Sequence, residues 1–167
     1  MPAGSTYEPI ATTTLGSSTS SVTFSSIPST YTDLVVVFVG TVNGDTVYMT
    51  FNSDTGTNYS RTYIDGDGAT AYTGRTGSAS NMRLSGIMTS LVNTVPALIT
   101  LDIFSYSGST YKTVLQSLNV DKNGSGEVAR QVHLWKSTAA VSTISLNAGA
   151  STFTTGTSIT LYGITKA

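Results

Sequence analysis

Apolar residues recur at every second position along most of this chain, and this period of two constrains the fold more than any other feature of the sequence. Successive side chains of a β-strand point to opposite faces of the sheet, so the alternation predicts strands with one buried face. The run "LVVVFV" at 34–39 does not alternate and predicts a strand buried on both faces. The alternating sets are Val22 and Phe24; Val47, Met49 and Phe51; Ile99, Leu101 and Ile103; Val114, Gln116, Leu118 and Val120; Val132 and Leu134; Ile144 and Leu146; and Ile159 and Leu161.

Turn signals separate these runs. Asn43-Gly44 in "VNGD" suits a type I′ turn, which needs positive φ at both central residues. It predicts a hairpin between a strand that ends near Gly40 and one that starts at Thr46. About eight to ten strands at this spacing predict an all-β sandwich or barrel.

Two stretches depart from the alternation. In "LSGIMTSLVNTV" at 84–95 the apolar residues fall at helical spacing, but Gly, Thr, Asn and Val are poor helix formers and Pro96 closes the segment. A strand followed by a buried loop is therefore favoured over a short helix. Residues 1–9, with two prolines and a glycine, predict an extended N-terminal arm, and residues 10–167 a single sandwich domain.

The composition narrows the function classes. Only 10% of the residues are charged, about a third are Ser or Thr, and the net charge is -1, so we expect no nucleic acid or anionic membrane as a partner. Cysteine is absent, which excludes disulfides and thiolate metal sites. The longest apolar run is far too short to span a bilayer, and no signal peptide is recognisable at the N-terminus. We expect a soluble protein made in a cytosol.

The stretch "NYSRTYIDGDGATAY" at 58–72 holds the densest run of chemically capable side chains. Read as an EF-hand from Asp65, it lacks the required ligand at position 5, the glycine at position 6 and the acid at position 12. An irregular cation site of Asp54, Asp65 and Asp67 stays open, although a plain turn is favoured. Glycines flank Asp65 and Asp67, which argues against the positioned acid pair of a glycoside hydrolase. We therefore predict no metal and no cofactor.

His133 is the only histidine, so any Ser-His-Asp triad would have to use it. The chain has no G-x-S-x-G elbow, and the alternation of His133 with Val132 and Leu134 predicts that it points outward on the polar side of a strand. The segment "GSGEVA" at 124–129 matches a dinucleotide-binding spacing, but no acid follows Glu127, so we predict a hairpin turn instead. The chain is predicted not to be an enzyme.

Three segments carry a resemblance to a known group of proteins. They are "YEPIATTTLGSSTSSVTFSSIPSTYTDLVVV" at 7–37, "FNSDTGTNYSRT" at 51–62 and "WKSTAAVSTISLNAGASTFTTGTSITLYGI" at 135–164. Together they resemble small virion structural proteins of tailed bacteriophages. The resemblance implies a jelly-roll-like antiparallel β-sandwich on the particle surface, in capsid decoration proteins or in head and tail fibres.

The absence of a repeat or coiled coil, which a fibre shaft needs, favours the decoration role. We therefore expect a capsid decoration (cement) protein that binds the major capsid protein or other virion proteins. We expect it to form a homotrimer, and residues 1–9 to help it dock. The alternative is a receptor- or carbohydrate-binding module of a fibre that uses Tyr59, Tyr63 and the loop 65–67. The partner surface itself is not predictable from the sequence; Tyr7, Tyr31, Tyr111 and Trp135 are unranked candidates.

Overall fold

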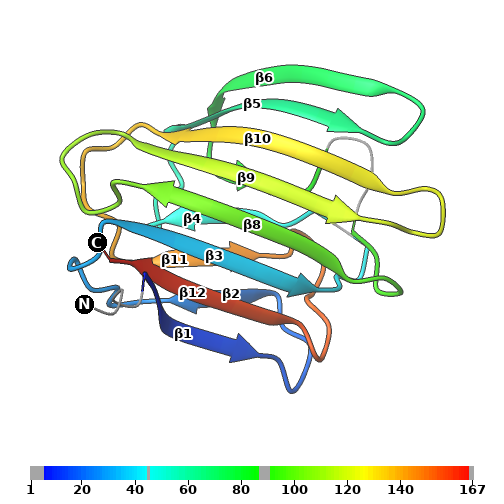
Figure 1. Ribbon diagram of the computed structural model, residues 1–167, viewed down its shortest axis with the longest axis horizontal. Coiled ribbons are helices and arrows are strands. Elements are labelled where there is room, and N and C mark those ends of the chain that lie inside the picture. The colour runs from blue at the N-terminus through cyan, green and yellow to red at the C-terminus, as the bar shows by residue number, and fades with distance from the viewer. Residues whose placement is uncertain (1–5, 45, 87–90, 166–167) are drawn as a thin grey trace.

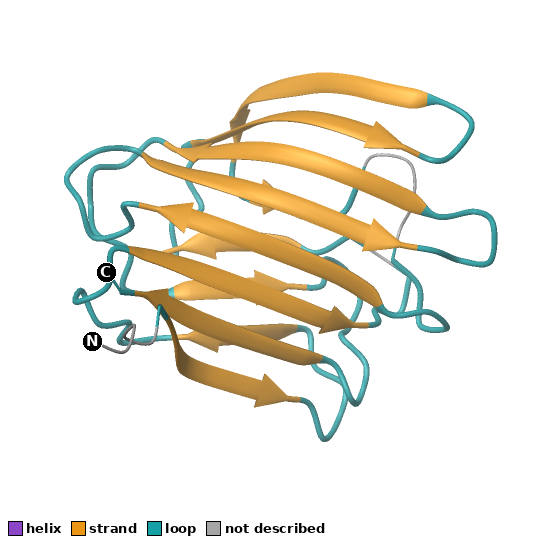
Figure 2. Ribbon diagram, viewed as in Figure 1, coloured by secondary structure: helices purple, strands orange, loops and turns teal. Residues whose placement is uncertain are grey.

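A computed structural model describes residues 6–44, 46–86 and 91–165, and these form strands and loops without a helix (Figure 2). The predicted all-β antiparallel sandwich is confirmed, but the described residues form twelve strands instead of the expected eight to ten, in one sheet of eight and one of four. The strands are β1 (Tyr7–Thr14), β2 (Ser21–Phe24), β3 (Asp33–Gly40), β4 (Tyr48–Phe51), β5 (Tyr59–Gly66), β6 (Ala71–Ala79), β7 (Met82–Arg83), β8 (Ala97–Phe104), β9 (Lys112–Val120), β10 (Glu127–Trp135), β11 (Ile144–Asn147) and β12 (Ser158–Ile164).

The two sheets differ in width. The large sheet has the order β1-β12-β3-β8-β9-β10-β5-β6, and the small sheet has the order β2-β11-β4-β7. Figure 1 shows the small sheet behind the half of the large sheet that holds β3, β8 and β12, while β5 and β6 extend beyond it. The inner face of the large sheet therefore continues past the edge of the small sheet.

The core lies between the sheets and holds most of the alternating residues that the sequence marks. Val132 and Leu134 are the exception, because they lie on the outer face of the large sheet. Met49 and Phe51 of β4, Ile144 and Leu146 of β11, and their counterparts on β3, β8, β9 and β12 are buried together. Phe38 packs against Phe153 with ring centroids 5.7 Å apart, and Phe51 meets Trp135 edge-on at 5.5 Å. The edge-on arrangement of Phe51 and Trp135 is one that aromatic quadrupoles favour.

The predicted arm ends earlier than expected. Tyr7, Glu8 and Pro9 pair with Ile164, Gly163 and Tyr162 of β12, so the large sheet begins at Tyr7 rather than at residue 10. Residues 1–5 lie outside the described residues. The sequence does not predict β1 and β6, because their residues are mostly polar or half-buried and show no apolar alternation. It does not predict β7 because two residues are too few to show a period.

The hairpin predicted at "VNGD" is wrong. β3 pairs with β12 and β8 in the large sheet, whereas β4 pairs with β11 and β7 in the small one, so the chain crosses between the sheets here. Of Asn43 and Gly44, only Gly44 has positive φ (86°), and a type I′ turn needs both. Val42 and Val47 on either side are fully buried and anchor the crossing in the core.

The ambiguous segment 84–95 contains no helix in its described part. Leu84 continues from β7 through a 2.7 Å bond from its backbone N–H to the Val47 carbonyl, and both Leu84 and Leu91 are buried. Residues 87–90, where the helical spacing is densest, lie outside the described residues. We call residues 84–86 the strap, because this stretch lies against the inner face of the large sheet.

Candidate functional site

The carboxylates considered as a cation site do not meet. Asp65 is a fully buried residue near the end of β5, and Asp67 is in the turn that follows, where its Oδ1 accepts bonds from the N–H groups of Ala69 (2.9 Å) and Thr70 (2.7 Å). Asp54 lies beyond the opposite end of β5, next to the Tyr59–Trp135 pair. In the described ranges no three His, Cys, Asp or Glu side chains are grouped to hold a metal ion.

Asp54 instead organises its own loop. Its carboxylate accepts bonds from the Trp135 indole N–H at 2.7 Å, the Asn58 side-chain amide and the backbone N–H of Gly56. These donors, the indole foremost, lower the pKa of the Asp54 carboxyl. Asn52 and Ser53, which both have positive φ, turn the chain just before it. The segment "FNSDTGTNYSRT" therefore has a structural explanation as a braced loop.

His133 is buried, with only 1% of its surface exposed, so the prediction that it points outward is wrong. Its Nε2 lies 2.8 Å from Oε1 of Gln116 on the neighbouring strand. Because the Gln116 side-chain nitrogen donates to the Leu84 carbonyl, Oε1 accepts and His133 donates from Nε2. Burial, with the positive charge of Arg61 nearby, lowers the pKa of His133 to about 3. The ring is thus a neutral structural donor.

The polar residues on the inner faces of β9 and β10 follow from the strap that covers them. Gln116 donates to the carbonyl of Leu84, and Gln131 donates to that of Ser85 at 3.3 Å. Backbone carbonyls removed from water need such donors, since an unsatisfied one costs about 1–3 kcal/mol. Gly86 leaves no room for a side chain, because a Cβ there would lie 1.4 Å from Oε1 of Glu127.

Two arginines come together beside this polar layer. Arg61 projects from the inner face of β5, and Arg83 from β7, the edge strand of the small sheet. They line a cavity of about 170 Å³ whose lining residues are all half-buried. The other lining residues are Tyr48, Ser60, Thr76, Ala79 and Asn81. Burial lowers the pKa of Arg61, and the positive charge of Arg83 lowers it further. The two charges therefore act on each other.

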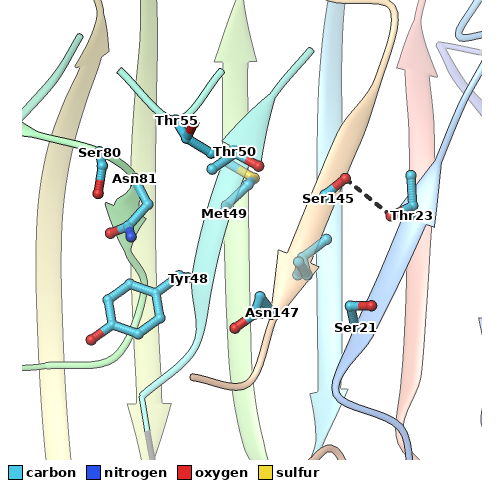
Figure 3. A pocket seen from close by; sticks show the side chains of 11 residues that line it. Ser21, Thr23, Tyr48, Met49, Thr50, Thr55, Ser80, Asn81, Ser145 and Asn147 are labelled. Atoms are coloured by element: carbon cyan, nitrogen blue, oxygen red, sulfur yellow. Dashed lines mark hydrogen bonds between the residues drawn. The ribbon is translucent and has the colours of Figure 1, made fainter. Parts of the chain in front are cut away.

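A larger groove of about 360 Å³ adjoins this cavity on the outer face of the small sheet. Figure 3 shows it running across β4, β11 and β2, with Tyr48 and Asn81 at one end and Ser21 and Thr23 at the other. Its lining is composed of hydroxyl, amide and apolar groups, without a charged residue. Tyr48 and Asn81 line both hollows, so the groove and the arginine cavity are neighbours.

The outer face of the large sheet is different in character. No part of the described chain forms a third layer over it, and it exposes six large apolar side chains. Ile64 on β5 and Val128 on β10 have 61% and 64% of their surfaces exposed. The set, which we call the outer apolar face, is Val39, Ile64, Leu98, Phe104, Val128 and Val132. Val39 and Leu98 are cross-strand partners, and Ile64 pairs with Arg130 between Val128 and Val132.

The remaining sequence-based site residues fall into two groups. Tyr59 and Trp135 are buried, and the Tyr59 hydroxyl donates to the Asp54 carbonyl at 3.0 Å, so Tyr59 and Asp65 are not available to bind a sugar as the alternative supposed. Tyr7 and Tyr111 are more than half exposed, and Tyr31 is half-buried. "GSGEVA" is confirmed as a hairpin turn: β9 and β10 pair across it from Val120 and Glu127.

Comparisons of the chain with protein-family models, with curated proteins and with solved structures gave no match. The class that the fold defines is an all-β antiparallel sandwich with two layers of unequal width. Among the described residues there is no helix of the length and hydropathy needed to cross a membrane.

Proposed function

We propose that this protein is a structural component of a tailed-bacteriophage virion, and that it is a capsid decoration protein bound to the outer surface of the head shell. The resemblance of residues 7–37, 51–62 and 135–164 to such proteins suggests the class. The major capsid protein or another virion protein is then the partner, and the particle surface is the location.

The outer apolar face is the observation that carries this proposal. Exposed apolar side chains that gather on one face of a soluble protein can mark a protein–protein contact. Here they form two groups on one sheet face, Val39 and Leu98 on β3 and β8, and Ile64, Val128 and Val132 on β5 and β10. Asn119 of β9 lies between Leu98 and Val128. A rigid sheet can dock without ordering flexible segments, which keeps the entropic cost of binding low.

Binding of the purified protein to heads that lack it tests the proposal. We expect Val128→Lys with Val132→Lys to reduce occupancy on the heads about tenfold or more, because two charges would be placed in an apolar contact. Thr23→Lys is the matched control, since it adds a charge to an exposed strand position on the small sheet. Occupancy that survives the paired substitution, in a variant shown to be folded by circular dichroism, would remove the outer apolar face from the interface.

The arm proposed to help docking can now be tested without damaging the sheet. Deletion of residues 1–5 leaves every pair of β1 with β12 intact. Reduced occupancy of the shortened protein on heads supports a docking role, and unchanged occupancy excludes one.

The homotrimer stays a prediction. Light scattering of the free protein measures its mass in solution and tests it.

The chain is further proposed to have no enzymatic activity. His133, the only histidine, is buried and neutral, and it donates from Nε2 to another side chain instead of facing a cleft. A general base must reach the proton that it removes, and this ring lacks that access.

A further inference from the structure

We propose that Arg61 and Arg83 form an anion site at the end of the groove on the small sheet, and that the two together bind an acidic saccharide. The carboxylate would sit at the two guanidinium groups, and the sugar hydroxyls would lie along β4 and β11. This site is separate from the outer apolar face and does not depend on the virion role.

The arginines are the first part of the argument. In the described part of the chain neither Arg61 nor Arg83 forms an ion pair with a carboxylate. Arg83 donates to the Gly86 carbonyl at 2.9 Å and to Ser85, while Arg61 donates to Gln131 at 3.4 Å and lies 4.9 Å from the centroid of the Tyr63 ring. These contacts hold both guanidinium groups in place without neutralising them. The charge of Asp65, on the same face of β5, acts in the opposite direction and raises the pKa of Arg61.

Two like charges in a half-buried cavity repel each other, and an anion relieves that repulsion. Arginine suits a carboxylate because its planar fork donates two parallel bonds. The cavity volume of about 170 Å³ restricts the site to a small anionic group. An anion in this position would also meet the polar side chains of Tyr48, Thr76 and Asn81, which line the same cavity.

The adjoining groove identifies the rest of the ligand. Its outward-facing rows are Ser21–Asn147–Tyr48 and Thr23–Ser145–Thr50, which are in register across β2, β11 and β4. Hydroxyl and amide groups both donate and accept, which matches a polyol better than an apolar or a second charged ligand. Tyr48 adds an aromatic ring at the junction of the groove and the cavity, as Figure 3 shows for the groove side.

A comparison of acidic and esterified saccharides tests whether the ligand's negative charge is needed for binding. Oligosaccharides that contain a uronate or sialate residue are titrated into the full protein by calorimetry, beside the same compounds with the carboxylate methylated. We expect the acidic form to bind at least about tenfold more tightly, as loss of a charge-assisted hydrogen bond implies. Equal affinity of acids and esters, or no binding of any acid in the panel, would overturn the proposal.

Substitutions of single arginines test where on the protein the acid binds. Arg61→Gln and Arg83→Gln are each expected to weaken binding of the acid about tenfold, since each removes a charged donor. Arg75→Gln removes the same charge from the exposed opposite face of β6 and should change the affinity by less than about twofold, as expected for a screened charge. An equal loss in Arg75→Gln would mean that only net charge matters, which contradicts a site.

The contribution of the groove needs a separate test, because a small anion can bind at the two arginines without contacting the groove. Thr50→Val removes one hydroxyl from β4 at nearly constant shape and should weaken the saccharide but not inorganic sulfate. Equal effects on both, or sulfate binding as tightly as every acidic saccharide, would reject the saccharide. If an arginine variant fails to fold, NMR titration of the native protein with the acidic saccharide tests the site instead. The backbone amide shifts should change at Tyr48, Thr76 and Asn81 and not at Val128, and the reverse would reject the site.

Discussion

At the scale of single residues, the inside of β10 is more polar than its outside. Glu127, Gln131 and His133 point into the sandwich, whereas Val128 and Val132 point into solvent. The cause is the strap, whose backbone carbonyls are satisfied by Gln116 and Gln131. Alternation predicts the strand correctly, but the covering element decides which face is buried.

Replacement of His133 by glutamine tests the buried ring. The unfolded histidine takes up a proton below about pH 6.5, whereas the folded ring does so only near a pKa of about 3. Its contribution to stability is therefore complete above about pH 6.5 and falls by about 1.4 kcal/mol for each pH unit below it. The glutamine side chain of the variant keeps a donor for Gln116 but does not titrate.

Denaturant unfolding of both proteins at pH 7, 5.5 and 4.5 measures this difference. The native protein should lose about 2–3 kcal/mol more than His133→Gln between the first and last condition. A free-energy gap between the two proteins that is independent of pH would show that the ring titrates normally.

Asp54 is the residue that braces the loop between β4 and β5. Replacement by Ala removes the acceptor of the Trp135 indole and should cost about 1–3 kcal/mol of unfolding free energy, because the donor of a buried side chain loses its partner. Asp121→Ala is the control, since that carboxylate bonds only the N–H of Gly124 in an exposed turn among the described contacts. Equal effects of the two substitutions in thermal melts would contradict the bracing role of Asp54.

At the scale of elements, β12 depends on a close approach at Gly163. A Cβ at this position would lie 2.3 Å from Cγ of Tyr31, so the ring of Tyr31 packs directly on the strand backbone. This contact explains the glycine in "LYGI".

Gly163→Ala should therefore displace Tyr31 and cost about 1–3 kcal/mol, the range typical of overpacking. Gly77→Ala in β6 is the matched control, because nothing lies within 4 Å of a Cβ there. We expect it to leave the melting temperature unchanged or to raise it slightly. A tolerated Gly163→Ala would mean that Tyr31 can move away at little cost.

Elements also differ in how far they could be predicted. Met49 and Phe51, and likewise Ile159 and Leu161, reveal β4 and β12 because each strand has one buried face. The edge strand β6 has no fully buried residue and alternates small and polar side chains, so nothing in its sequence marks it. The crossing at 42–47 is mispredicted as a hairpin because turn residues specify a local bend but not the strands that it joins.

At the scale of the whole molecule, the two ends of the chain are built into the same sheet. β12 lies between β1 and β3, so residues about 150 positions apart in sequence pair directly. A protein truncated before Ser158 should lack cooperative unfolding in denaturant, because β1 loses its partner and β3 loses one of two. Deletion of residues 1–5 is the control and should retain a single sharp transition. A sharp transition in the truncated protein would show that β12 is dispensable.

The two proposed binding surfaces lie on different sheets of the molecule. The outer apolar face lies on the large sheet, and the groove with Arg61 and Arg83 lies on and beside the small sheet. One protein could thus attach through the first surface while the second remains open. The two tests are independent, since the lysine substitutions on β10 should not change saccharide affinity.

The sequence by itself determined the strand character of most of the chain and the hairpin at 121–126, because alternation and turn chemistry act between near neighbours. Only the tertiary structure decided that His133 is inside, that the chain changes sheets after Gly40, and that Arg61 meets Arg83. Each of these depends on which distant segment covers a strand or stands beside it. That choice is made by the packing of the complete sandwich, so no local pattern records it.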